Sequence, residues 1–246
     1  MRIETLIIGD ELLDGRVVDT NSVRLAALLQ QAGHKLVGRT TVVDDIEAIV
    51  GAATAIAGRH TSLCIVAGGL GPTDDDLTVE AFARLTDDEL SEDPEIVERL
   101  RETFEARGRT MTPNQLRQAR RPQGARRLDN PYGTAPGFSL EFEGCTFMAL
   151  PGVPREFNKL VERHVLPMVL GAGAHLERRI LRSFGLIEGV VEERLRPVLE
   201  ERPEVRVGYR ADFPEIEVSL SCLADASSAL EAAAQACEEA LSPHVF

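Results

Sequence analysis

A glycine-rich turn followed by acidic residues constrains the fold of this chain more than any other stretch. It occupies residues 67–78 and reads Ala-Gly-Gly-Leu-Gly-Pro-Thr-Asp-Asp-Asp-Leu-Thr. The apolar run 62–66 before it is typical of a buried strand, and the apolar spacing of 79–85 after it is typical of a helix. This order of strand, turn and helix predicts an α/β domain, in which ligands bind beyond the carboxyl ends of the strands.

The residue types in this turn suit a phosphate-bearing ligand. Glycines let backbone N–H groups approach a phosphate closely, and the start of a helix favours negative charge. Three successive carboxylates, at positions 74–76, would repel that phosphate unless a divalent cation lay between them. The glycines alone are equally typical of a tight turn with an ordinary helix cap. The three acids favour a metal-assisted site, because one cap needs only one acceptor.

The composition limits the classes of binding partner and the cellular compartment to be expected. The chain has 246 residues and a net charge of −13, which argues against nucleic acid or an anionic membrane as the main partner. It has no signal-peptide pattern and no apolar run long enough to cross a membrane, so we expect a cytoplasmic protein. The four cysteines lack CxxC spacing and are expected to be buried thiols in a reducing compartment.

Strand and helix patterns alternate along the first part of the chain. Strand patterns at 4–8 and 35–43 precede helix patterns that end near residues 31 and 57. The alternation predicts a three-layer domain, with a mainly parallel sheet covered by helices on both faces. Acidic residues follow three of the strands and are expected to meet at one edge of the sheet; they are Asp10, Glu11, Asp44, Asp45 and the acids of the turn.

The second half of the chain changes pattern twice. Charged helices are expected at 94–107 and 112–120, and a hairpin at 138–150. Five arginines between 117 and 127 are typical of a solvated face, with an anion-binding rim as the alternative. Residues 171–174, Gly-Ala-Gly-Ala, predict a linker. A β-α-β-β-α pattern follows, so we expect domains at 1–170 and 171–246, the second a small α+β subdomain.

Four motifs resemble signatures of the competence/damage-inducible protein CinA family. They are 9–15 with 19–22, the turn at 68–78, the loop 130–137 and the strand-to-helix turn 150–156. The resemblance implies a molybdopterin-binding-like domain of the MogA/MoaB type, followed by the family's small subdomain. It also implies metal-dependent ADP-ribose pyrophosphatase activity, which yields AMP and ribose 5-phosphate. Full-length bacterial members carry a further nicotinamide-nucleotide amidase domain, which this sequence does not reach, so deamidation is not expected of it.

The motifs and the strand ends together define an expected site. The expected catalytic residues are Asp44, Asp75 and Asp76, with Asp44 or Asp45 as a base for the attacking water. The expected ligands of Mg²⁺, with Mn²⁺ or Co²⁺ as alternatives, are Asp10, Glu11, Asp75 and Asp76. The expected phosphate and nucleotide contacts are Gly9, Asn21, Ser22, Gly68, Gly69, Gly71, Thr73, Thr78, Asn130, Gly133, Pro151, Gly152 and Arg155.

Three functions remain open from the sequence. The first is a metal-dependent hydrolase of a nucleotide diphosphate bond, with ADP-ribose as the leading substrate and FAD as the substrate of a related domain. The second is a molybdopterin-binding protein of molybdenum cofactor metabolism, in which the same turn holds a terminal phosphate. The third is a protein-interaction module in the small subdomain. The expected partners are a small nucleotide and a second copy of the chain in a homodimer.

Overall fold

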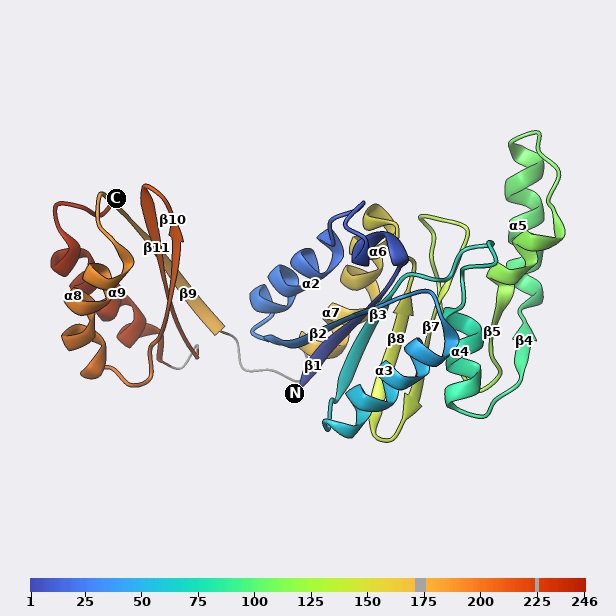
Figure 1. Cartoon of the computed structure of the whole chain (residues 1–246), viewed down its shortest axis with the longest axis horizontal. Coiled ribbons are helices and arrows are strands. Elements are labelled where there is room, and N and C mark those ends of the chain that lie inside the picture. The colour runs from blue at the N-terminus through green and yellow to red at the C-terminus, as the bar shows by residue number, and fades with distance from the viewer. Residues whose placement is uncertain (171–175, 224–225) are drawn as a thin grey trace. The chain divides into compact units, whose positions relative to one another are not determined.

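The computed structural model describes residues 1–170, 176–223 and 226–246. The chain divides into two compact units, one built around a six-stranded sheet and the other around a three-stranded sheet (Figure 1). The expected linker at 171–174 lies outside the described residues.

The first unit contains a sheet with the strand order β2-β1-β3-β8-β7-β6. The strands are β1 (Ile3–Ile8), β2 (Leu36–Val42), β3 (Leu63–Ala67), β6 (Arg126–Leu128), β7 (Gly137–Phe142) and β8 (Cys145–Leu150). The first four strands in that order are parallel to one another, β7 pairs antiparallel with β8, and β6 pairs antiparallel with β7. The expected mainly parallel sheet and the expected hairpin are therefore confirmed. β1 and β3 are buried along their whole length, which explains their unbroken apolar runs.

Helices cover both faces of this sheet. They are α1 (Asp10–Leu13), α2 (Thr20–Gln31), α3 (Ile46–Gly58), α4 (Thr78–Leu85), α6 (Pro154–Leu160) and α7 (Leu166–Leu170), with a π-helical turn, η2 (Val161–Val165), between the last two. α3 and α4 lie on one side, and α2, α6 and α7 lie on the other (Figure 1). Phe82 of α4 packs against the rings of Phe138 and Phe147, with centroid distances of 5.8 and 5.3 Å. The three-layer α/β fold expected from the sequence is confirmed.

An excursion between α4 and β6 carries its own small core. It comprises β4 (Leu90–Glu92), α5 (Pro94–Ala106), the 3₁₀ helix η1 (Pro113–Ala119) and β5 (Arg120–Pro122), and β4 pairs antiparallel with β5. α5 confirms one expected helix, whereas the second is a short 3₁₀ helix that ends where β5 begins. The arginine cluster is paired with acids: Arg121 and Arg127 both contact Asp93, at 2.9 and 3.1 Å. This pairing favours the solvated-face interpretation over an anion-binding rim.

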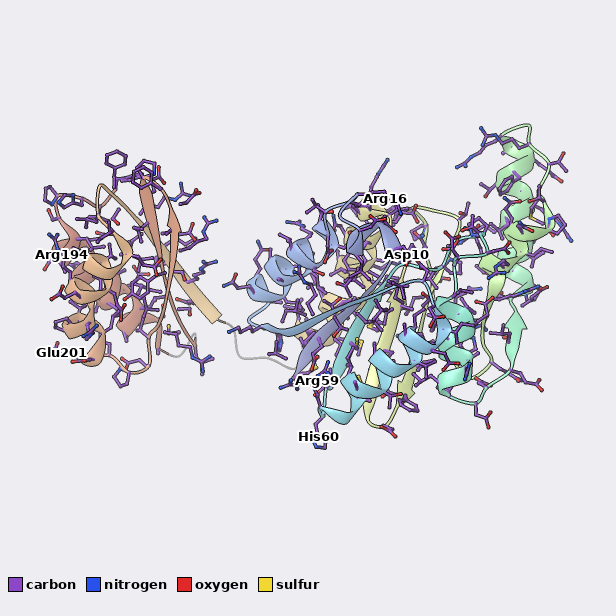
Figure 2. The ribbon with its side chains drawn as sticks, in the orientation of Figure 1. Asp10, Arg16, Arg59, His60, Arg194 and Glu201 are labelled. Carbon is purple, nitrogen blue, oxygen red and sulfur yellow. The ribbon has the colours of Figure 1, made fainter. Side chains whose placement is uncertain are left out.

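A buried carboxylate lies near the start of β1. Glu4 is 1% exposed, and its oxygens accept hydrogen bonds from Arg59 at 2.6 Å, Thr61 at 2.7 Å and Arg2 at 3.1 Å. The bond from Arg59 is the main reason why the pKa of Glu4 falls to about 2. Arg59 lies at the end of the sheet opposite Asp10 (Figure 2).

The second unit is a two-layer α+β structure. Its elements are β9 (Leu176–Phe184), α8 (Glu188–Glu200), β10 (Arg206–Asp212), β11 (Glu215–Leu223) and α9 (Ser227–Leu241). The antiparallel sheet has the order β10-β11-β9. Alternate residues of β11, among them Val218 and Leu220, are buried in a core that includes residues of both helices. The expected β-α-β-β-α subdomain is confirmed.

Two further expectations concern the cysteines and membrane-spanning helices. Cys64, Cys145, Cys222 and Cys237 are buried, as expected from their spacing. No helix in the described ranges has the length and apolar character needed to span a membrane.

Candidate functional site

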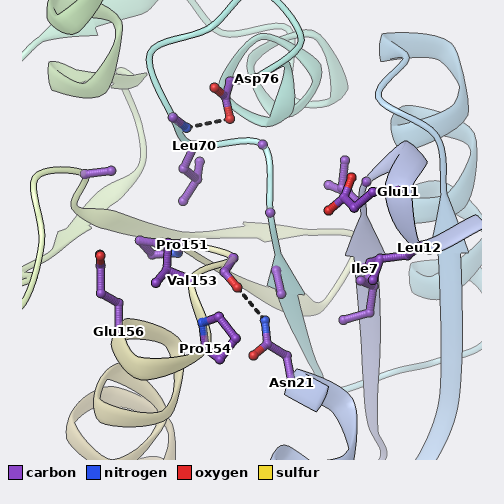
Figure 3. A pocket seen from close by; sticks show the side chains of 18 of the residues that line it. Ile7, Glu11, Leu12, Asn21, Leu70, Asp76, Pro151, Val153, Pro154 and Glu156 are labelled. Carbon is purple, nitrogen blue, oxygen red and sulfur yellow. Dashed lines mark hydrogen bonds between the residues drawn. The ribbon is translucent and has the colours of Figure 1, made fainter. Parts of the chain in front are cut away.

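A cavity of about 560 Å³ lies beyond the carboxyl ends of the parallel strands (Figure 3). Its walls come from the segments that follow β1, β2, β3 and β8, which is where open α/β sheets bind ligands. The volume falls within the range of about 300 to 1,000 Å³ that is usual for small-molecule sites. The site expected from the sequence therefore corresponds to a cavity in the fold.

Glycines form the floor of this cavity because no larger residue fits there. A Cβ on Gly68, where φ is +109°, would lie 2.2 Å from the carbonyl oxygen of Ile8. A Cβ on Gly69, where φ is +65°, would lie 2.2 Å from Oγ1 of Thr78. A Cβ on Gly152 would lie 3.3 Å from Cα of Gly68, so the loops after β3 and β8 abut here. The floor is therefore bare backbone.

Some amides of this floor are used by the fold and others are not. The N–H of Gly68 donates to the carbonyl of Leu150 at 3.2 Å, which continues the β3–β8 pairing. Within the described parts of the chain, no hydrogen bond uses the N–H of Gly69, Leu70 or Gly152. All three residues line the cavity. Their amides are thus donors that an anionic ligand can satisfy.

Asp76 shapes the glycine turn from within. Its Oδ1 accepts the N–H of Gly71 at 2.7 Å (Figure 3). Its Oδ2 accepts both the N–H and the hydroxyl of Thr73, at 2.9 and 2.5 Å. The hydroxyl of the buried Thr78 donates to the carbonyl of Gly68 at 2.8 Å. In this structure, three residues expected to contact metal or phosphate hold the conformation of the turn.

On the other side of the cavity lie carboxylates whose negative charge is little neutralised by neighbouring cations. Asp10 and Asp44 each accept the backbone N–H of the other, at 3.1 and 3.0 Å. Burial raises the pKa of Asp44, and the charges of Asp10, Glu11 and Asp75 raise it further, while the bond from the Asp10 amide lowers it. The first unit therefore concentrates negative charge at this edge of its sheet.

The donor chemistry of this edge suits a hard cation, but the geometry is not that of a closed metal centre. Carboxylate oxygens are the ligands that Mg²⁺ prefers. Across the residues that the structure describes, no three Asp, Glu, His or Cys side chains are arranged to hold a metal ion. Of the expected ligands, Asp76 has both oxygens engaged by the turn, and Asp10 lies outside the cavity lining. An ion here would be held by one or two carboxylates and by the phosphate of a ligand.

Most of the expected site residues line the cavity. They are Gly9, Glu11, Asn21, Asp44, Gly68, Gly69, Gly71, Asp75, Asp76, Pro151 and Gly152. The expected residues outside the lining are Asp10, Ser22, Thr73, Thr78, Asn130, Gly133 and Arg155. Ser22 donates its N–H and its hydroxyl to Asp19, and Arg155 is exposed at the start of α6. Neither side chain contributes to the cavity surface in this structure.

Several cavity residues were not expected from the sequence. Glu156 ends the fourth motif, and its position in that motif is the signal that was available. Gln118 and Thr134 come from distant segments that only the tertiary fold brings to the cavity. Arg117 acts next to the cavity: it donates to the carbonyl of Asp76 at 3.1 Å and to Glu80 at 3.0 Å. No spacing in the sequence relates these residues to the glycine turn.

Comparison with known proteins identifies the fold and then the family. Residues 4–171 match the model of the "probable molybdopterin binding domain", and residues 178–246 match that of the "damage-inducible protein CinA KH domain". The first unit is therefore a molybdopterin-binding-type α/β domain, as its sheet and its cavity indicate. The chain belongs to the CinA family, which confirms the resemblance seen in its motifs.

Individual relatives agree with this assignment. A solved structure of CinA from Thermoplasma acidophilum, described as having unknown function, is 32% identical with a TM-score of 0.61 and covers 68% of this chain and 97% of that one. CinA-like proteins of Citrifermentans bemidjiense and Geobacter metallireducens are 39% and 42% identical over 100% and 94% of this chain. The chain spans 59% and 57% of the lengths of these two proteins.

Proposed function

We propose that the cavity of the first unit binds a phosphate-bearing pterin of the molybdopterin type. The observation that carries this proposal is a set of three cavity-lining residues, Gly69, Leu70 and Gly152, whose backbone N–H groups have no partner among the described residues. Such a cluster of N–H groups at a strand end is a phosphate site. The match to a molybdopterin-binding family model supports the same class of ligand.

Aliphatic side chains among the lining residues suit the ring of such a ligand. Val17, Val18 and Val153 line the cavity and are 50%, 79% and 55% exposed. Exposed aliphatic side chains in the lining of a pocket offer an apolar surface that a ligand can cover. The cavity thus combines donors for a phosphate with an apolar surface for a flat ring.

A substitution in the floor tests the binding proposal. We expect Gly69→Ala to weaken binding of neopterin monophosphate at least 100-fold in isothermal titration calorimetry, because its Cβ would displace Thr78 and distort the amides. The matched control is Gly51→Ala in α3, where an added Cβ meets no atom within 4 Å. Gly152→Ala, whose Cβ would lie 3.3 Å from its nearest neighbour, should show a smaller loss of affinity. It keeps the proposal testable if Gly69→Ala fails to fold. Equal affinities of wild type and Gly69→Ala would refute the proposal.

A second candidate function is metal-dependent hydrolysis of a nucleotide diphosphate such as ADP-ribose. The observation that favours it is that Asp44 lines the cavity together with Glu11 and Asp75; burial and these neighbouring acids raise its pKa, as suits a general base. A divalent ion held beside a ligand diphosphate would neutralise its charge and lower the pKa of a bound water. In hydrolysis, water would add across the diphosphate bond and release AMP and ribose 5-phosphate.

A substrate panel separates the two candidates. ADP-ribose and FAD are incubated with the chain and Mg²⁺, Mn²⁺ or Co²⁺, and released AMP is measured. If the chain is a hydrolase, Asp44→Asn should lower turnover about 10²- to 10⁴-fold while binding persists. If no AMP appears with any pair and pterin binding is intact, the hydrolase candidate is rejected and the binding function stands.

A further inference from the structure

Glu156 lines the cavity on the side opposite Glu11. It lies in the first turn of α6, is half-buried and lines the cavity. Figure 3 shows it on the other side of the cavity from Glu11. Its role is therefore separate from that of the acids that follow β1 and β2.

A buried amide fixes this carboxylate in place. Asn130, which is 0% exposed, donates its Nδ2 to Oε2 of Glu156 at 2.7 Å and to the carbonyl of Ala135 at 2.8 Å. Oδ1 of Asn130 accepts the N–H of Tyr132 at 3.0 Å, so every polar atom of its side chain is engaged. A Cβ on Gly133 would lie 1.9 Å from Oε2 of Glu156, so the loop closes tightly around the carboxylate. The orientation of Glu156 is thus set before any ligand arrives.

The carboxylate of Glu156 keeps acceptor capacity that Asp76, another acid in the cavity lining, has lost. Both oxygens of Asp76 accept bonds from the glycine turn. In the described portion of the chain, Oε1 of Glu156 accepts no hydrogen bond, and no arginine or lysine forms an ion pair with this residue. An ionised carboxylate offers about four acceptor sites, of which Asn130 uses one. A ligand that meets Glu156 must therefore bring N–H or O–H donors.

We infer that Glu156 recognises the paired N–H donors of a 2-amino-4-oxopyrimidine ring, the ring that pterins and guanine share. In that ring, a ring N–H and the exocyclic amino group point the same way and can donate to the two oxygens of one carboxylate. Adenine places a ring acceptor beside its amino group, and that acceptor faces a carboxylate oxygen unfavourably. This inference rests on the proposed phosphate-bound ligand and specifies the ring that the site selects.

Nucleotides that differ only in the base test the inference on the full chain. We expect calorimetry to give a dissociation constant for GDP about 10- to 100-fold lower than that for ADP, with IDP, which lacks the amino group, in between. Glu156→Gln should weaken GDP binding by the same factor and leave ADP binding unchanged. The matched control is Glu162→Gln, an exposed acid paired with Lys159 on the following helical turn.

A second variant and a second ligand sharpen the result. Gly133→Ala pushes the carboxylate aside without touching the glycine floor and should remove the preference for GDP in the same way. Neopterin monophosphate binding more tightly than GMP identifies the pterin as the preferred source of the ring, and the reverse order identifies guanine; both support the inference. Equal affinities for GDP and ADP in the wild type, or equal losses for both in Glu156→Gln, overturn it while the phosphate site stands. Absence of binding for every phosphate compound overturns the proposed function as well.

Discussion

The two ends of the large sheet differ in how they accommodate a carboxylate. At the start of β1, Glu4 is enclosed by Arg59, Arg2 and Thr61, and its pKa falls to about 2. Just past the carboxyl end of the neighbouring β2, burial raises the pKa of Asp44, and surrounding acids add to the effect. Arginines stabilise the charge of Glu4 at one end of the sheet, whereas among the described residues no arginine or lysine forms an ion pair with Asp44 at the other end.

This difference separates the part of the domain that maintains the fold from the part that binds. A compensated carboxylate adds to stability, whereas an uncompensated one lowers it and persists where a ligand or ion supplies the missing charge. The cavity opens at the uncompensated end. The electrostatic asymmetry of the sheet therefore locates the site independently of the glycine turn.

The largest expected effect is at the compensated end. Glu4→Gln should lower the free energy of unfolding by about 2 kcal/mol, because it removes charged hydrogen bonds from a buried position. The matched control is Glu98→Gln, which breaks the exposed pair with Arg101 and should cost less than about 0.5 kcal/mol. Urea denaturation at pH 7 measures both. Similar losses in the two variants would contradict the comparison.

The same residue predicts a pH dependence with a definite sign. Since folding lowers the pKa of Glu4 from 4.5 to about 2, its stabilisation is complete above pH 4.5 and is lost as the pH falls toward 2. The stabilities of wild type and Glu4→Gln should therefore converge across that interval, as followed by thermal melts between pH 2 and 6. A gap that stays constant would show that the pKa shift is absent.

An intermediate effect is expected at Arg117, which joins the excursion to the glycine turn. Arg117→Met removes its bonds to the Asp76 carbonyl and to Glu80, and should cost about 1 kcal/mol of stability and about tenfold in affinity for a phosphate ligand. Arg101→Met, in the exposed pair with Glu98, is the control and should leave affinity unchanged. Calorimetry with neopterin monophosphate would contradict the expectation if both variants bound like the wild type.

The smallest effect is expected at the uncompensated end, and it has the opposite sign. Because the pKa of Asp44 is raised in the fold, its ionised form costs stability once the pH exceeds the folded pKa. Asp44→Asn, which keeps an acceptor for the Asp10 amide, should therefore raise the melting temperature at pH 7 by about 1 to 2 °C. The increase should vanish in acid, below the ordinary pKa of an aspartate. A lower melting temperature at pH 7 would show that the charge at this edge is compensated after all.

The fold follows from patterns that are local in the sequence. The unbroken apolar runs of β1 and β3 and the alternation along β11 each report burial directly, and the structure has these elements within a few residues of their expected positions. The four-residue α1 was not expected, because a single turn of helix is too short to show the 3.6-residue spacing of apolar residues. The 3₁₀ character of η1 is also invisible to apolar spacing.

The sequence predicted the location of the site more accurately than the role of each residue in it. Asp75 and Asp76 are identical in type and adjacent, yet only the backbone of the turn decides that Asp76 points inward to Gly71 and Thr73. Asp44 and Asp45 were interchangeable in the sequence, whereas in the structure Asp45 caps α3 through the N–H of Ala48. Asn130 was expected to touch a ligand and instead holds Glu156. Roles of this kind depend on which oxygen faces which donor.

The walls of the cavity come from residues as far apart as Gly9 and Glu156. No smaller piece of the first unit can therefore assemble the binding surface, and a ligand that occupies it holds the strand ends together at once. Occupancy at 100 times the dissociation constant would raise the free energy of unfolding by about 2.7 kcal/mol. Melting curves recorded against a library of phosphorylated heterocycles thus offer a direct route to the natural ligand.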